Sequence, residues 1–269
     1  MAQKQTRYQQ IADDLRRRIE SREWAAGTPL PTEGNLQKEY KASRNTVRDA
    51  IKLLQQHHLL EPKVGQGTFI TPEIVPFVTT LSADPKTGRG RGGEEGATYP
   101  AEVGEQGREA GAGAPQVQVI KCPPQIAARL KIEESKRVVS RYQERLIDGT
   151  IWSLQTSYYP LEWVQKGAEG LLDPEDILEG TVSYLAETIG LKQIGCRDLI
   201  SARLPNDKEQ ELFGLTHNYT VIEIYRTSFA DDEENTPIRV TVTVYPSDRN
   251  QIVYDIGTVP DTREEAVQL

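Results

Sequence analysis

The chain has few cysteines, histidines and long apolar runs, and each shortage excludes a class of protein. Its 269 residues include two cysteines, far apart and without metal-ligand spacing, which predicts reduced thiols rather than a disulfide framework. No apolar run approaches the ~18–20 residues that a transmembrane helix needs. The N-terminus also lacks the apolar core of a secretory signal. We therefore expect a cytoplasmic protein without a membrane partner.

Motifs of catalysis and cofactor binding are missing as well. The sequence has no Gly-x-Ser-x-Gly, no Walker loop, no His-Glu-x-x-His and no Cys-x-x-Cys. Of its three histidines, His57 and His58 close a predicted helix and His217 stands alone. The acidic run at 231–235 indicates a solvated loop between strands rather than a metal site. We expect no enzyme activity, no cofactor and no metal.

Charge is divided unevenly along a chain whose net charge is -8. Residues 1–72 hold 12 Lys and Arg against 8 Asp and Glu, a net charge of +4. The remainder holds 20 against 32, a net charge of -12. A basic module on an acidic body concentrates the attraction for phosphate at one end of the chain. This division favours a DNA-binding domain over residues 1–72.

The pattern within that domain predicts three helices and a hairpin. A first helix over 8–22 has apolar residues at every fourth position. Thr32 and Ser43 are suitable N-caps for a second helix and for a third that runs to about residue 57. Residues 59–70 predict a two-stranded hairpin with a Gly-Gln-Gly tip. Two short helices joined by a tight turn and followed by such a hairpin form a winged helix-turn-helix.

The third predicted helix has a cationic face about 120° from its apolar side. For an isolated helix a solvated surface would explain such charges, but the preceding helix and the following hairpin favour a helix that lies in the DNA major groove. The expected DNA contacts lie at helix N-termini, on this face and in the hairpin: Thr32, Ser43, Arg44, Asn45, Thr46, Arg48, Lys52, Lys63, Gly65, Gln66 and Gly67.

The composition changes after the hairpin. Residues 84–114 contain nine glycines and almost no large aliphatic side chains, which predicts a structureless segment within a linker over 73–116. From 117 to 260 the predicted strands outnumber helices and mostly follow one another, which indicates an antiparallel α+β domain. A hairpin over 137–159, turning at Asp-Gly, is its strongest local signal. Residues 261–269 are a tail.

The stretch from residue 8 to residue 70 resembles the N-terminal domain of the GntR family of bacterial transcription regulators. The motifs that carry the resemblance are Leu-Pro-Thr-Glu at 30–33, Ser-Arg-Asn-Thr-Val-Arg-Asp-Ala at 43–50, Leu-Leu at 59–60 and Gly-Gln-Gly-Thr-Phe-Ile at 65–70. The resemblance implies that Arg44 and Arg48 contact base edges or adjacent phosphates and that the wing glycines enter the minor groove. Gly34 departs from the family, which usually has arginine there, so the usual operator should not be assumed.

The second half resembles the effector-binding UTRA domain of the HutC subfamily, which shares the chorismate lyase fold. The motifs that carry it are Arg-Leu-Ile-Asp-Gly at 145–149, Ser-Tyr-Tyr-Pro at 157–160 and Val-Tyr at 244–245. The resemblance implies a pocket for a small anionic effector, with Arg145 binding the anionic group. An exposed cross-strand pair is the alternative role for this arginine. The implied pocket residues are Gln143, Arg145, Gln155, Ser157, Arg239 and Tyr245.

Three of these positions depart from sugar-phosphate-binding relatives. Gln143 replaces a second arginine, Gln155 a glutamate and Arg239 another acidic residue. Because carboxylates bind sugar hydroxyls well, the loss of both acidic residues argues against an amino-sugar phosphate. Arg239 would suit a ligand with a second carboxylate or a carbonyl.

The expected function is that of a repressor which binds an inverted-repeat DNA operator as a homodimer and responds to a small anionic effector. Residues 71–83 could order against the effector pocket, with Thr79, Thr80 and Ser82 meeting the ligand's anionic group. Two alternatives remain. The second domain could serve only for dimerisation or a protein partner, or it could be an enzyme, which the missing catalytic motifs disfavour.

Overall fold

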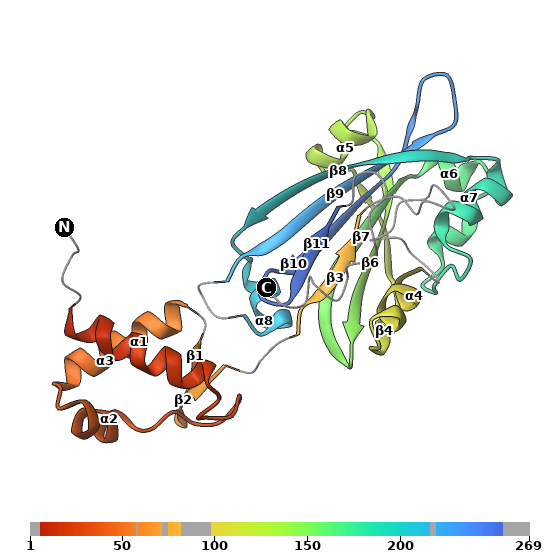
Figure 1. The fold of residues 1–269 in the computed structure, drawn as a ribbon. Coiled ribbons are helices and arrows are strands. Elements are labelled where there is room, and N and C mark those ends of the chain that lie inside the picture. The colour runs from red at the N-terminus through yellow and green to blue at the C-terminus, as the bar shows by residue number, and fades with distance from the viewer. Residues whose placement is uncertain (1–5, 58, 72–74, 82–97, 216–218, 255–269) are drawn as a thin grey trace. The chain divides into compact units, whose positions relative to one another are not determined.

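The structure is a computed structural model that describes residues 6–57, 59–71, 75–81, 98–215 and 219–254 (Figure 1). The chain divides into two compact units, one up to Ile74 and one from Val75 onward. None of the described helices is long and apolar enough to cross a membrane. Both cysteines are free thiols, with Cys122 buried and Cys196 exposed.

The first unit has the predicted winged helix-turn-helix order. Its elements are α1 (Arg7–Glu20), α2 (Glu33–Tyr40), α3 (Arg44–Gln56), β1 (Leu60–Lys63) and β2 (Gly67–Ile70). The two strands pair antiparallel, with Leu60 opposite Ile70. Apolar stripes of the three helices meet in a core in which Leu15, Leu36 and Val47 are fully buried. The periodicity of the sequence therefore predicted this unit correctly.

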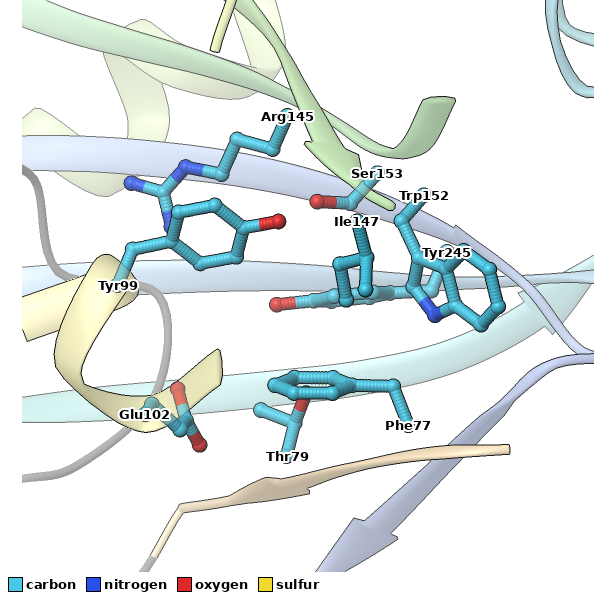
Figure 2. Close-up of a pocket in the computed structure, with 9 residues that line it drawn as sticks. All are labelled: Phe77, Thr79, Tyr99, Glu102, Arg145, Ile147, Trp152, Ser153 and Tyr245. Atoms are coloured by element: carbon cyan, nitrogen blue, oxygen red, sulfur yellow. The ribbon is translucent and has the colours of Figure 1, made fainter. Parts of the chain in front are cut away.

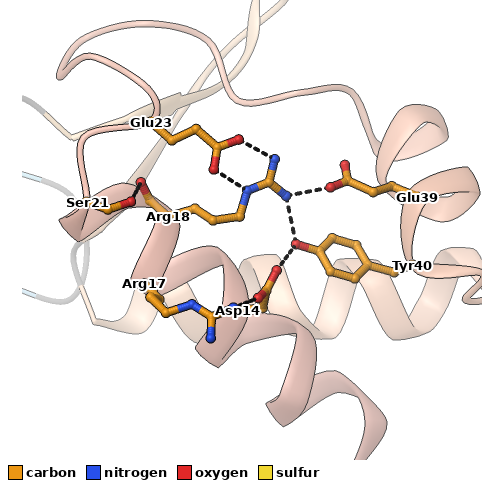
Figure 3. Close-up of polar contacts among 7 residues, drawn as sticks. All are labelled: Asp14, Arg17, Arg18, Ser21, Glu23, Glu39 and Tyr40. Carbon is orange, nitrogen blue, oxygen red and sulfur yellow. Dashed lines mark hydrogen bonds and ion pairs between the residues drawn. The ribbon is translucent and has the colours of Figure 1, made fainter.

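A polar network joins α1 to α2 on the surface of this unit (Figure 3). The Arg18 guanidinium donates hydrogen bonds to Glu23 (2.7 and 2.8 Å), Glu39 (2.6 Å) and the Tyr40 hydroxyl (3.0 Å). That hydroxyl donates to Asp14 Oδ2 at 2.7 Å. Burial, and then the hydrogen bond with Asp14, raise the pKa of Tyr40 to about 12. Tyr40 thus stays a neutral link between a cation and a carboxylate.

The second unit is built on an antiparallel sheet, whose described strands follow the order β4-β6-β7-β10-β9-β8, with β5 also paired to β6. These strands are β4 (Ala110–Ala112), β5 (Gln116–Lys121), β6 (Arg137–Ile147), β7 (Thr150–Pro160), β8 (Gln193–Arg203), β9 (Val221–Ala230) and β10 (Pro237–Pro246). A separate parallel pair consists of β3 (Phe77–Thr80) and β11 (Asn250–Val253).

Short helices pack on both faces of this sheet. They are α4 (Thr98–Glu105), α5 (Pro124–Leu130), α6 (Glu162–Gln165), the 3-10 helix η1 (Glu169–Leu172), α7 (Thr181–Ile189) and α8 (Asp207–Phe213). The expected α+β class and antiparallel sheet are confirmed. Side chains of α6, η1 and α7 pack with Val139 and Tyr159 in one apolar cluster. Because side chains alternate along a strand, Arg141, Gln143 and Arg145 of β6 lie on the same face as Val139. This part of the face is therefore polar.

The structure differs from the sequence-based expectation between residues 98 and 114. This part of the segment expected to be structureless forms α4 and β4, and β4 pairs with β6. Val103 of α4 is fully buried, and the Tyr99 hydroxyl donates to Leu146 O at 2.9 Å. Polar bonds to distant backbone, together with one buried valine, hold a segment that has little apolar surface of its own. The earlier part of the segment, up to residue 97, lies outside the described residues.

Candidate DNA-binding surface and effector pocket

Glu33 of α2 holds the two arginines of α3 that were expected to contact DNA. Arg44 Nε donates to Glu33 Oε2 at 3.0 Å, and Arg48 Nε donates to both carboxylate oxygens at 2.9 and 3.1 Å. These arginines, first Arg48 and then Arg44, lower the pKa of Glu33. The side chain of Arg44 is 63% exposed and that of Arg48 is 48% exposed. Because the contacts use only Nε, the terminal nitrogens of both guanidinium groups have no hydrogen bond within the described part of the chain.

The N-termini of α2 and α3 have the predicted caps. Thr32 Oγ1 accepts from the Asn35 amide at 3.3 Å, and Ser43 Oγ accepts from the Thr46 amide at 3.2 Å. The Ser43 and Thr46 hydroxyls also lie 2.8 Å apart. Asn45 and Lys52 are exposed on the same helix. The capping bonds use the hydroxyl oxygens as acceptors, which fixes the helix ends at which phosphate could bind.

The wing tip needs glycine for its backbone conformation. Gly65 has φ +74° and Gly67 has φ +115°, values that side chains disfavour. Crowding is not the reason for glycine, because a Cβ at either position would meet nothing within 4 Å. Gln66 is exposed between them, and its amide donates to Lys63 O at 3.0 Å, closing the turn. Lys63 pairs with Glu61 at 3.1 Å and lies over the Phe69 ring at 4.6 Å. Lys63 is therefore held along the hairpin, close to its tip.

Sequence reasoning missed the role of Glu33, although it lies in the Leu-Pro-Thr-Glu motif. Its position beside an N-cap is explained by the favourable interaction of a carboxylate with a helix N-terminus. Only the packing of α2 against α3 shows that it also orients two arginines. Gly34, the next residue, is exposed, and a Cβ there would meet nothing within 4 Å. Crowding therefore does not explain why glycine replaces the family's arginine.

A cavity in the second unit contains two of the six expected effector residues (Figure 2). Its volume is about 10 Å³, which is room for about one water molecule. The residues that line it come from β3, α4, β6, β7 and β10: Phe77, Thr79, Tyr99, Glu102, Arg145, Ile147, Trp152, Ser153 and Tyr245. We call it the Arg145 cavity.

Arg145 lies deep in this cavity, with 4% of the residue exposed. Its guanidinium lies 4.7 Å from the centre of the Tyr99 ring, so Arg145 is not the exposed cross-strand pair of the alternative interpretation. Burial raises the pKa values of both Tyr99 and Tyr245, and the charge of Arg145 opposes that effect. Both phenols therefore stay neutral and can donate or accept hydrogen bonds.

Glu102 and Thr79 lie across the cavity from Arg145 (Figure 2). Glu102 Oε1 accepts from the Thr80 amide at 3.1 Å, and burial raises the pKa of the Glu102 carboxyl. Of the three residues expected in a ligand-ordered segment, Thr79 lines the cavity, Thr80 contributes its amide, and Ser82 lies outside the described residues. Tyr99 and Glu102 were missed because their helix falls in the glycine-rich segment.

Gln143 and Gln155 line a neighbouring cavity of about 10 Å³ together with Pro115, Arg141, Asp176 and Ile177. The two glutamines are directly opposite each other on β6 and β7, and Arg145 and Ser153 form the next pair on that face. Gln143 Nε2 donates to Asp176 Oδ1 at 2.8 Å and to Gly113 O at 3.0 Å.

Two other expected effector residues line neither cavity. Ser157 is fully buried, and its hydroxyl lies 3.1 Å from that of Thr241. Arg239 is 2% exposed, and its Nη2 donates to Ser228 Oγ at 3.4 Å. Both are buried side chains of the sheet that lie outside these two cavities.

The family of the chain follows from comparison with known proteins. The model described as bacterial regulatory proteins, gntR family, matches residues 7–70, and the UTRA domain model matches residues 105–251, more than half of the chain. The chain belongs to the GntR family and carries a UTRA domain. The UTRA match begins inside the segment expected to be structureless, which agrees with the position of β4 in the sheet.

Relatives of this GntR-family regulator cover most of its length. The HTH-type transcriptional regulator GmuR of Bacillus subtilis is 23% identical over 238 residues, covering 84% of this chain and 88% of GmuR. The transcriptional repressor NagR of the same organism is 21% identical over 248 residues, covering 92% and 93%. These relatives are transcription regulators, so the chain is a DNA-binding transcription regulator and not an enzyme.

Solved structures share the fold of this regulator. A GntR-family transcriptional regulator superposes with a TM-score of 0.68 at 23% identity, covering 95% of this chain and 99% of the other. PhnF from Mycobacterium smegmatis superposes with a TM-score of 0.54 at 19% identity, covering 92% and 99%.

Proposed function

We propose that this regulator is a repressor of the HutC subfamily that binds an inverted-repeat operator as a homodimer. The proposal rests on the exposed pair Arg44 and Arg48, whose guanidinium groups Glu33 holds by Nε alone. A guanidinium with free terminal nitrogens can donate two hydrogen bonds to guanine O6 and N7. The hydroxyls at the helix N-termini and the wing glycines would fix the register on the phosphates.

The dimer would form through the second unit, at the edge strand β8. Among the described strands β8 pairs with β9 alone, and it lies at the end of the sheet. Ile194, Leu199 and Ile200 of β8 are 54%, 54% and 48% exposed. Leu199 and Ile200 are adjacent and so lie on opposite faces of the sheet. A long edge strand with apolar side chains on both faces is typical of one that another chain covers.

The effector would be a small anion that enters the Arg145 cavity. An arginine with a carboxylate, hydroxyls and aromatic rings around it offers a charged anchor and further groups for orientation. Binding would lower operator affinity because the effector binds one dimer arrangement more tightly than the other. NagR is named a repressor, and so is MngR of Escherichia coli, which is 43% identical over 70 residues, 26% of this chain and 29% of MngR.

Selection of bound sequences from a random duplex pool at near-physiological salt tests the proposal. Recovery of one inverted repeat, with a dimer in analytical ultracentrifugation, supports it. Arg48→Ala should then cost ~1–3 kcal/mol of operator affinity, about 5- to 150-fold, and relax specificity at one base position. If no motif is recovered and the binding is lost as the salt concentration rises, the protein is attracted only to phosphate. That result would contradict an operator-specific function.

A further inference from the structure

Side chains of α4 and of the turn directly after it occupy the edge of β3 that faces away from β11. Val78 N–H donates to Gln106 Oε1 at 3.1 Å, and Gln106 Nε2 donates back to Val78 O at 2.8 Å. Two residues on, Thr80 N–H donates to Glu102 Oε1 at 3.1 Å. Glu102 lies in α4, and Gln106 lies in the turn directly after it. They make with β3 the hydrogen bonds that a neighbouring strand would make.

This arrangement makes α4 a wall of the Arg145 cavity that is held by side-chain contacts instead of backbone pairing. The cavity has room for about one water molecule, so a larger occupant must displace part of its lining. Its floor consists of β6, β7 and β10, which are joined by continuous backbone pairing. By contrast, α4 and the turn after it are held to β3 by the side chains of Glu102 and Gln106 and to β6 by the Tyr99 hydroxyl. The buried side chain of Val103 adds an apolar contact.

Glu102 takes part in both the cavity and the attachment. Its Oε1 accepts from Thr80, while its Oε2 has no hydrogen bond among the residues that the structure describes. It lines the same cavity as Arg145 (Figure 2). Among the described residues that line the cavity, Glu102 is the one that carries a carboxylate. The carboxylate of this site therefore comes from a helix, whereas Arg145 comes from a strand.

We propose that Glu102 binds a hydroxyl or ammonium group of the effector, in place of the Thr80 amide, while Arg145 binds the effector's anionic group. This inference rests on the proposed function of the Arg145 cavity. The ligand class is an anion that also carries hydrogen-bond donors; a bare dianion is disfavoured, because it would face a like charge. Loss of this bond leaves the Thr80 amide of β3 without its acceptor. β3 is the first described strand after the boundary between the two units.

Two probes separate these requirements in the full-length chain. Inorganic phosphate is an anion with few donors, and D-glucose 6-phosphate adds several hydroxyls. Glu102→Gln should weaken glucose 6-phosphate binding about tenfold and strengthen phosphate binding, since it removes a charged acceptor and a like charge together. Glu105→Gln is the matched control: it makes the same chemical change on an exposed residue of α4 and should alter neither affinity. Isothermal titration calorimetry measures both affinities.

Hydrogen exchange over residues 75–81 tests the link to β3. Saturating glucose 6-phosphate should speed exchange of the Thr80 amide, which bonds to Glu102, and Glu102→Ala should do the same without ligand. The Val78 amide bonds to Gln106 and should not change. Equal changes for both probes in Glu102→Gln, or unchanged exchange in the liganded protein, would overturn the inference. If phosphate binds and Arg145→Gln abolishes that binding, the Arg145 cavity is supported as the anion site even when the inference about Glu102 fails. Failure of both probes to bind at about 10 mM would overturn the cavity and the inference together.

Discussion

Gly34→Arg restores a side chain that the family resemblance implies and that this chain lacks. Gly34 is exposed, is the second residue of α2, and has open space around the position of a Cβ. It follows Glu33, which holds the two arginines of α3. An arginine at 34 therefore fits without displacing any neighbour and begins close to the surface expected to face DNA.

The expected gain in operator affinity exceeds the effect on folding. Replacing glycine in a helix stabilises it by up to ~1 kcal/mol, while a cation in the first turn costs ~0.3–1 kcal/mol against the helix dipole. These two effects on folding nearly cancel. One bidentate contact with guanine is worth ~1–3 kcal/mol, or about 5- to 150-fold in affinity for a site that presents guanine there. A phosphate contact alone would instead steepen the salt slope by ~0.9.

Fluorescence anisotropy with the selected operator, titrated at several salt concentrations, measures both quantities. Gly34→Ala is the control, because it changes the helix propensity without adding a cation. We expect tighter binding by Gly34→Arg alone, with a new base preference when the random-pool selection is repeated. If Gly34→Arg and Gly34→Ala have the same affinity for every sequence and equal salt slopes, position 34 does not face DNA, and the proposed contact between the N-terminus of α2 and DNA is wrong.

Three further outcomes test the first unit. Tyr40→Phe removes the hydroxyl between Arg18 and Asp14 and should cost ~1–2 kcal/mol in urea denaturation. Ser43→Ala removes the N-cap of α3 and should cost ~1 kcal/mol in the same assay. Because two arginines lower the pKa of Glu33, its contribution to stability is complete above its ordinary pKa of 4.5 and is lost as pH falls through the lower folded value. Thermal melts of Glu33→Gln should therefore depend less on pH in that acidic range.

The first unit was predictable because its signals are local. Thr32 and Ser43 cap helices in the structure as the sequence predicts, since an N-cap hydroxyl bonds to an amide only three residues away. The hairpin in the second unit was predictable for the same reason. Asp148 and Gly149 both have positive φ, +51° and +76°, in the two-residue turn between β6 and β7. Such residues fix both the position of the turn and the register of its strands.

Helix α4 was not predictable because its stabilising contacts are distant in sequence. Gln106 and Glu102 bond to backbone 28 and 22 residues earlier, and Tyr99 bonds to Leu146, 47 residues later. The prediction from composition considered only the apolar surface that residues 84–114 can bury, which is small. Hydrogen bonds to backbone that would otherwise be unpaired offset part of the ordering entropy here. The error also removed Glu102 and Tyr99 from the predicted site.

The arginines on the polar face of the sheet have different roles that sequence alone cannot distinguish. Arg141 donates to the carbonyls of Leu171 (3.0 Å), Asp173 (2.7 Å) and Glu175 (2.7 Å), so its charge holds the chain that follows η1.

Arg226 makes two bonds to Asp198, at 2.8 and 2.7 Å, which is the usual arrangement for a buried cation. Arg145 instead lies at a cavity, against an aromatic ring and across from a carboxylate on a helix. A buried cation beside a cavity would exchange its neighbours for a ligand at less cost than one held by a carboxylate of the same sheet. That difference in surroundings, rather than the arginine motif itself, is why we propose Arg145 as the effector-binding cation.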